Sequence, residues 1–327
     1  MNFEKAVKAK QIVKAISLIP FIAMAVPCFV SAEENKEEVT EQAEVGLWSD
    51  HQYRELILET ESAKSSNAPP RTRALTGIEY EHIDNENQPN EELLHYIYAD
   101  GFTRVTDTFS MGYVFKEIHH SRGGESTGQS NYSEIIPSFY WRKNDNVAYN
   151  LMLSYEKTIG EWHYDKYMAK PGIDLSFGRH FLHLSAELGY KDERQGPGSR
   201  GAFIESEPLY LYRLDNGINI GAKVIYVEEH NDFNYVEFAV KPLIQFNFDN
   251  GNYLELRYER GTLDMGSDPN NRDHFDYDVY ALYTDLPINE HFSFLADIQI
   301  KDRHADPAPW TGDQLVWFSK VGIVWKF

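Results

Sequence analysis

Apolar and polar residues alternate along most of this chain from Arg73 onward, and turn residues interrupt the alternation at short intervals. A β-strand points successive side chains to opposite faces, so each segment predicts a strand with one apolar and one polar face. The last segment follows the same rule and ends on an aromatic residue, with Val321, Ile323, Trp325 and Phe327 on its apolar face.

Two kinds of connection separate the predicted strands. The six tight turns are expected at residues 99–101, 143–146, 178–180, 214–217, 248–251 and 288–291, and two of them contain Asn-Gly, a strong hairpin signal. Seven longer polar stretches alternate with them, at residues 84–90, 121–131, 160–161, 192–200, 229–232, 261–273 and 302–311. This order predicts fourteen strands, with both ends of the strand region on the tight-turn side.

Aromatic residues gather at both ends of the predicted strands. Near the longer connections they are Tyr80, Phe115, Tyr155, Tyr190, Tyr226, Tyr258 and Phe275, and near the tight turns Phe139, Trp141, Phe177, Tyr212, Phe246, Phe292, Trp325 and Phe327. Bilayer interfaces select two such belts around an apolar band. A soluble β-sandwich would show the same alternation, but the belts, the even strand number and the amphipathic terminal strand favour an all-β, transmembrane, antiparallel up-and-down β-barrel over residues 73–327.

The first 72 residues follow other patterns. Four lysines precede an apolar run over residues 15–30, and Val30-Ser31-Ala32 is a small-residue cleavage site, so residues 1–32 are expected to be a secretory signal peptide. The one cysteine, Cys28, lies inside it, so the mature protein is expected to contain no thiol. Residues 33–72 are acidic and then Ser/Asn/Pro-rich, which predicts a mostly flexible segment; a short amphipathic helix over residues 48–60 is the alternative.

Charge and hydropathy narrow the possible environments. The charges of residues 1–32 sum to +3, so the mature chain carries a formal charge of −23, against −20 for the whole chain. Such acidity makes nucleic acid a poor partner. After residue 32 no stretch reaches the roughly 20 apolar residues that a transmembrane helix needs. We therefore expect an exported barrel in the outer membrane of a Gram-negative bacterium, in contact with its lipids.

The polar faces of the predicted strands carry many charges. A barrel of eight strands is filled by its own side chains, whereas a barrel of sixteen to eighteen strands encloses an aqueous channel. A fourteen-stranded barrel with a charged interior is therefore predicted to enclose a water-filled pore. The expected pore-lining residues are Glu79, Glu81, Lys116, Arg142, Asp174, Glu187, Glu205, Glu207, Arg213, Lys223, Glu237, Lys241, Glu255, Arg257, Asp276, Asp278, Asp297 and Lys301. Their slight acidic excess predicts a weak cation preference. Neither a metal-ligand spacing nor a phosphate-binding glycine loop occurs, so no metal or cofactor is expected.

Fourteen strands in one chain, a polar lumen and this C-terminal strand resemble the outer membrane protein G porins. The resemblance implies a monomeric porin of low specificity for passive diffusion of small hydrophilic solutes such as sugars and ions. In that family two histidines on neighbouring strands form a pH gate, and the segment from His274 to Val279, thirty residues before His304, has the matching separation. Carried over, His274 and His304 would repel when both are charged and release residues 261–273 into the mouth. Strand parity from the sequence predicts an inward His274 and an outward His304.

Three alternatives come from other classes. A porin specific for acidic oligosaccharides would favour a basic lumen, which the acidic excess opposes. His119-His120-Ser121-Arg122-Gly123 is similar to the H-x-S-x-G string of outer-membrane phospholipase, in which a histidine activates a serine. That family has twelve strands, however, so we expect no enzyme. A structural or adhesin role would require long, aromatic-rich loops.

Overall fold

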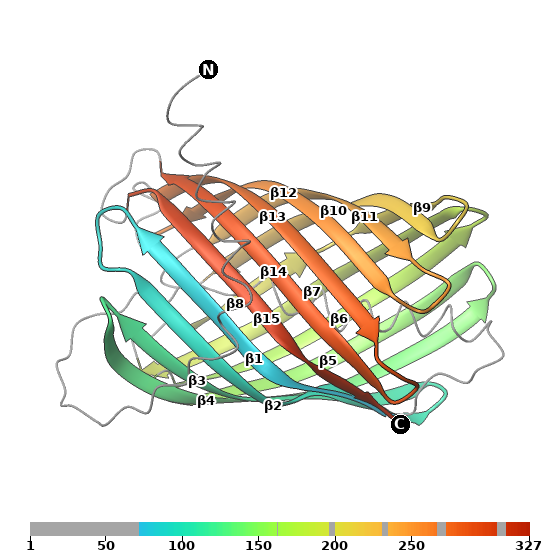
Figure 1. Cartoon of the computed structure of the whole chain (residues 1–327), viewed down its shortest axis with the longest axis horizontal. Helices are drawn as coiled ribbons and strands as arrows, with labels where there is room; N and C mark the ends of the chain where they lie inside the picture. The colour runs from blue at the N-terminus through green and yellow to red at the C-terminus, as the bar shows by residue number, and fades with distance from the viewer. Residues whose placement is uncertain (1–71, 162, 196–199, 231–234, 267–272, 306–311) are drawn as a thin grey trace, which may run out of the picture. The chain divides into compact units, whose positions relative to one another are not determined.

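A computed structural model of the chain describes residues 72–161, 163–195, 200–230, 235–266, 273–305 and 312–327. The predicted signal peptide and residues 33–71 lie outside this part. The described residues contain no helix long and apolar enough to cross a membrane. They form one antiparallel sheet that closes on itself as a barrel (Figure 1).

The wall contains fifteen strand segments. They are β1 (Thr72–Asn85), β2 (Glu91–Thr106), β3 (Phe109–Arg122), β4 (Glu125–Asn144), β5 (Val147–Gly160), β6 (His163–Phe177), β7 (His180–Gln195), β8 (Arg200–Ser206), β9 (Leu209–Arg213), β10 (Ile218–His230), β11 (Val236–Asn247), β12 (Tyr253–Met265), β13 (Asp273–Pro287), β14 (Phe292–Ala305) and β15 (Gln314–Lys326). Segments β8 and β9 both lie between β7 and β10, so they are two parts of one strand. The predicted fourteen-stranded barrel is confirmed.

Pro208 lies at the break between β8 and β9. Proline has no backbone N–H, so it cannot donate to a neighbouring strand. Its carbonyl still accepts a hydrogen bond from the Val224 amide at 3.0 Å. The register does not change across the break, because Ser206 pairs with Ala186 and Leu209 with His183. The proline therefore removes one donor without displacing the wall.

The two ends of the strand region close the barrel. Strand β1 pairs with β15 along its length, and β10 pairs with β11. At the seam the Thr72 amide donates to the Phe327 carbonyl at 2.9 Å, and the Phe327 amide donates to the Thr72 carbonyl at 2.8 Å. The terminal aromatic strand thus completes the wall, and both ends lie at the rim that carries the tight turns, as predicted.

Two predicted connections are wrong. The first tight turn lies at residues 107–108, not 99–101. Gly101 is inside β2, where it pairs with Ala74 and Tyr113 beyond a bulge near Ile97. The predicted loop at 121–131 is mostly strand, because β3 and β4 meet at a two-residue turn, Gly123-Gly124, with φ of 61° and 84°. Strands β3, β4 and β12 continue beyond the apolar band of the outward face. Polar residues in these extensions therefore belong to strands and do not indicate a loop.

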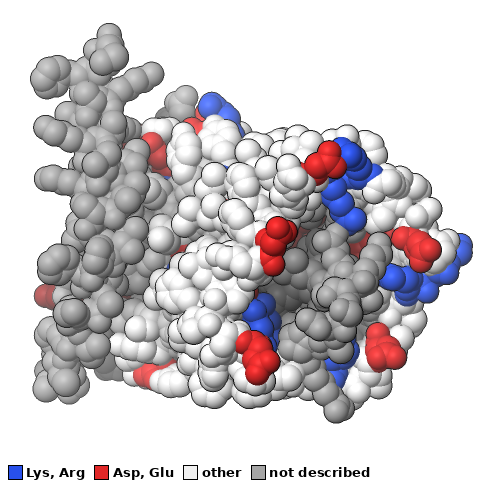
Figure 2. Space-filling model, turned by 45° about the vertical axis from the view of Figure 1, so that its right-hand side comes forward, with Lys and Arg blue, Asp and Glu red and all other residues white. Residues whose placement is uncertain are grey.

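Burial follows the strand alternation around the wall. On β11, Glu237, Ala239 and Lys241 are buried, whereas Phe238 and Val240 are 49% and 41% exposed. The exposed set forms an outward apolar face, and the buried set forms the inward face. The part of the barrel in Figure 2 is accordingly mostly uncharged, with charged side chains gathered toward one end.

The outward face predicts how stability depends on depth in the bilayer. Val240 lies near the middle of β11 and Val105 near the tight turn at residues 107–108. We expect Val240→Arg to lower the free energy of unfolding by about 2–4 kcal/mol and Val105→Arg by about 0–1 kcal/mol, since a cation costs most at the bilayer midplane. Denaturant titration in lipid vesicles measures both values. Equal losses would contradict the assigned apolar band.

Candidate functional site

The inward face of the barrel carries the charged residues that could act on a solute. The structure places sixteen of the eighteen predicted lining residues on this face. Most are buried; Arg142, near a tight turn, is exposed, and Arg213 lies 5.9 Å from the ring of the inward Phe181. Counting every second residue from the centre of each strand is therefore sufficient to identify most residues of the inward face.

Strand β13 is the exception. Asp276 and Asp278 point outward, with Asp276 59% exposed and Asp278 3.8 Å from the exposed Arg260. The inward positions here are Phe275, Tyr277 and Val279, in an apolar cluster with Leu263 and other neighbours. Near the loop end β13 is apolar inside and polar outside, whereas toward the tight turn its outward positions are apolar or aromatic, as at Tyr280 and Leu286. The prediction that Asp276 and Asp278 line the pore, and that Phe275 belongs to a belt, is wrong for this reason.

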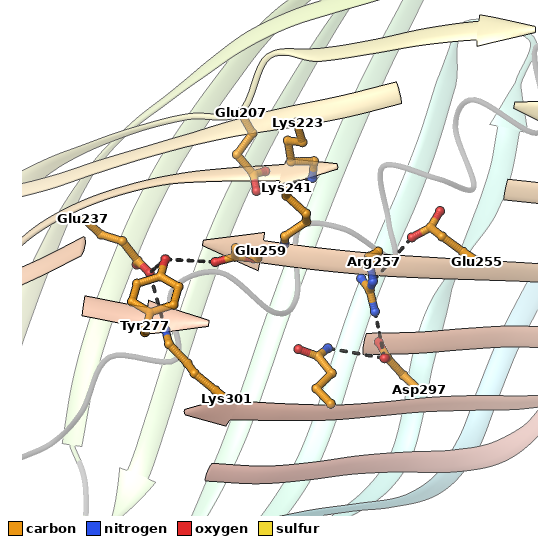
Figure 3. A network of polar contacts seen from close by, with 11 residues as sticks. Glu207, Lys223, Glu237, Lys241, Glu255, Arg257, Glu259, Tyr277, Asp297 and Lys301 are labelled. Carbon is orange, nitrogen blue, oxygen red and sulfur yellow. Dashed lines mark hydrogen bonds and ion pairs between the residues drawn. The ribbon is translucent and has the colours of Figure 1, made fainter. Parts of the chain in front are cut away.

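Tyr277 is the centre of one inward network (Figure 3). Its hydroxyl lies 2.9 Å from Glu259 and also within hydrogen-bonding distance of Glu237. Each carboxylate has a lysine: Lys241 lies 2.9 Å from Glu259, and Lys301 lies 3.5 Å from Glu237 and 3.8 Å from the Tyr277 ring centroid. The network joins β11 through β14 along the wall, so it holds the charges against one another at the lumen surface.

A second network lies beside it in Figure 3. Arg257 contacts Asp297 at 2.8 Å and Glu255 at 3.5 Å, and Gln299 donates to Asp297 at 3.3 Å. The side chains of Arg257 and Asp297 are 5% and 1% exposed. A buried ion pair requires such close geometry to offset the loss of hydration. The position of each charge is consequently fixed by its partner.

The third network is richest in acids. Lys170 lies 3.6 Å from Glu187 and 3.1 Å from Glu207, and Lys223 lies 3.4 Å from Glu207. Glu205, on the same strand as Glu207, is 1% exposed. Lys166 interacts with Glu187 and Glu205 and also with Glu156 of β5, so four carboxylates and three lysines on β5 to β10 give this part of the wall a local negative excess.

Further pairs include residues that the sequence did not single out. Glu79 accepts a hydrogen bond from Lys116 at 3.2 Å and lies 2.8 Å from His95. Three more pairs are Lys320 with Asp100 at 2.9 Å, Arg73 with Asp285 at 3.0 Å and Lys326 with Asp285 at 3.9 Å. Asp100 was missed because it was assigned to a turn, whereas His95, Lys170 and Asp285 could have been found by counting parity along their strands.

The two gate candidates lie on the outward face. The side chains of His274 and His304 are 40% and 44% exposed. His274 lies 2.7 Å from Asp264, and His304 lies 3.3 Å from Asp313. The prediction of an inward His274 is wrong, because β13 has the opposite parity, while the outward His304 agrees with prediction. Each imidazole has its own carboxylate, so protonation would strengthen a local pair outside the lumen.

The residues of the catalytic alternative are also outward. His119 Nε2 lies 2.9 Å from Glu117, and the Ser121 hydroxyl donates to Glu92 at 3.3 Å. A serine nucleophile is activated by giving its proton to a neighbouring base such as histidine. Here the hydroxyl proton of Ser121 is directed to a carboxylate of β2.

The inward face carries groups that can solvate a polar solute. Within the described ranges no group of three or more His, Cys, Asp and Glu residues could hold a metal ion. The networks present positive and negative groups at short intervals around the wall. Charged groups of this kind can replace part of the hydration of a polar or charged solute.

Comparison with known proteins gives structural likeness only. No family model and no curated protein matches the chain. A bacterial polysaccharide outer membrane secretin is 10% identical, with a TM-score of 0.48 over 80% of this chain and 100% of that one. A loop-deletion mutant of OmpT, an outer membrane protein of Vibrio cholerae, is 8% identical (TM-score 0.42; 77% and 98% covered). The KdgM porin in complex with disordered oligogalacturonate is 9% identical (TM-score 0.34; 78% and 99% covered).

Proposed function

We propose that this protein is a porin of the Gram-negative outer membrane that passes small hydrophilic solutes, including sugars and ions, by diffusion and with low specificity. The observation that carries the proposal is the opposite chemistry of the two faces. Outward residues such as Phe238, Val240 and Leu256 are 41–49% exposed, while the inward face carries paired charges. Water satisfies charges and lipid satisfies apolar groups, so this distribution suits a membrane wall around a polar lumen.

A single chain is proposed to form the functional pore. Strands β1 and β15 pair within the chain, so the wall has no edge that a second copy must cover. The lumen is enclosed by fourteen strands, a number between those of filled barrels and of wide channels. A small pore in each monomer follows from these two features.

The direct test is conductance of the refolded mature protein in a planar bilayer at neutral pH. We expect a steady conductance that appears and disappears in single steps, because each chain encloses its own lumen. Swelling of protein-loaded liposomes in sugar solutions provides the matching measurement for neutral solutes. Conductance in three coordinated steps would indicate a trimer. Neither conductance nor swelling would reject the porin proposal.

The acid-rich network predicts the ion preference. We expect a weak cation preference in a salt gradient, and Glu187→Gln should shift the reversal potential toward anions because it removes an inward charge that is paired with Lys170. Asp278→Asn is the matched control: it removes the same charge from the outward face and should leave the potential unchanged. Equal shifts in both variants would contradict the assigned faces of β7 and β13.

The outward histidines predict a negative result for the gate. Since His274 and His304 face carboxylates outside the lumen, the variant with both His274→Ala and His304→Ala should show the same conductance ratio between pH 7 and pH 5 as the wild type. Single-channel recording at the two pH values measures this ratio. Loss of acid closure only in the double variant would restore the gate that the family resemblance implies.

A further inference from the structure

Two glutamates lie opposite each other on the inward side of strands β4 and β5. Glu134 and Glu156 are direct partners in the antiparallel register. Partners of this kind have Cβ atoms about 4.5–5.5 Å apart, and like charges directly opposite each other are destabilising. Both glutamates are buried, and neither was expected as a lining residue from the sequence. The pair therefore requires a positive group that offsets its charge.

Basic side chains offset this charge only in part. In the described part of the chain, neither Glu134 nor Glu156 forms an ion pair with a lysine or arginine. Lys166 interacts electrostatically with both carboxylates from beyond ion-pair distance. The same lysine also interacts with Glu187, and its ammonium lies 4.4 Å from the ring centroid of Phe203. One shared lysine cannot neutralise two glutamates, so negative charge remains at the pair.

Hydroxyl groups surround the two carboxylates. The Tyr132 hydroxyl donates to Glu134 at 3.0 Å, and the Ser154 hydroxyl donates to the same carboxylate at 2.5 Å. The Tyr164 hydroxyl donates to Glu156 at 2.5 Å. These donors hold both carboxylates in place, and each hydroxyl oxygen retains lone pairs that can contact a cation. The cluster thus offers carboxylate and hydroxyl oxygens as ligands.

A further hydroxyl of this cluster has no hydrogen-bond partner among the described residues. Thr158 is 0% exposed, and its Oγ1 atom makes no hydrogen bond there. The register places Thr158 directly between Tyr132 and Tyr164, and it lies two residues from Glu156 on the same face. A buried hydroxyl of this kind is uncommon, and an ion or a water molecule is a usual partner for it. The Thr158 hydroxyl thus points to a bound group independently of the two charges.

We propose that Glu134, Glu156 and Thr158 bind a monovalent alkali cation such as Na⁺ at the inward face. Carboxylate and hydroxyl oxygens are the ligands that hard cations prefer. A tightly bound divalent ion would need more carboxylates, and the described ranges contain no group of three or more His, Cys, Asp and Glu residues suited to a metal ion. One monovalent charge, together with the shared Lys166, matches the two carboxylates.

The proposed site rests on the geometry of the wall alone. Its effect on ion preference rests also on the proposed porin function. The two proposals are therefore tested by different measurements, one of stability and one of conductance.

Stability in two salts tests the site without reference to conductance. The full mature protein is unfolded with urea in phosphatidylcholine vesicles, in NaCl or in tetramethylammonium chloride at equal ionic strength. We expect a higher urea midpoint in NaCl, since a ligand that binds only the folded state stabilises it. Glu134→Gln and Glu156→Gln should each abolish the difference. Glu259→Gln is the matched control: this buried inward glutamate also accepts from a tyrosine but is paired with Lys241 at 2.9 Å, so the difference should remain.

The Thr158 hydroxyl permits a second test that leaves every charge in place. Thr158→Val removes the hydroxyl and Thr158→Ser keeps it. We expect the Na⁺ concentration for half-maximal stabilisation to rise about tenfold in Thr158→Val and to stay within about twofold of wild type in Thr158→Ser, because only the first variant loses a ligand. In an NaCl gradient, Thr158→Val should also lower the preference for Na⁺ over Cl⁻ by about twofold. Equal changes in both variants would contradict contact between this hydroxyl and the ion.

The outcomes separate the two proposals. Equal urea midpoints in the two salts for the wild type would overturn the cation site. A larger rise in CaCl₂ than in NaCl at equal ionic strength would overturn the assignment to a monovalent ion. A rise specific to Na⁺ that is lost in Glu134→Gln but kept in Glu259→Gln, without conductance in any variant, would support the site while rejecting the porin function.

Discussion

The pairing of every backbone polar group within the wall is the constraint on which the rest of this structure depends. Inside a bilayer an unpaired N–H or C=O has no water to bind, so a sheet there must close. In this chain the closure occurs between β1 and β15, and the final residue takes part in it through reciprocal hydrogen bonds with Thr72. Pro208 shows the tolerance of the wall: one missing donor is accepted where the register on both sides is unchanged.

Closure also decides where charge can be placed. A closed wall has only two faces, and the apolar outward face leaves the inward face for charged residues. The inward networks join strands that are neighbours or lie at most three strands apart, as in Lys301 with Glu237 and Arg73 with Asp285. Pairs of this kind fix charges along the wall, and a solute in the lumen would then meet groups that need little rearrangement.

The two ends of the lumen differ from its middle. The inward side of β13 is apolar near the loops, at Phe275, Tyr277 and Val279, and a second buried apolar cluster lies toward the tight turns, formed by Leu75, Tyr253, Tyr283, Leu295 and Val324. Charged networks occupy the region between them.

The sequence alone determined the strand number, the antiparallel order, the rim at which the ends meet and the inward side of most strands. These follow from local rules, because side chains alternate with a period of two and hairpins need turn residues. The tertiary structure alone decided the parity of β13, the course of β2 through Gly101 and the partner of each charge. Pairs such as Arg257 with Asp297, forty residues apart, depend on register and strand tilt across several neighbours. At the loop end of β13 the apolar residues pack inside the barrel and the polar residues face outward, the opposite of the arrangement on the other strands. The residue pattern of this segment therefore does not show which face lines the lumen, and only the packing around it does.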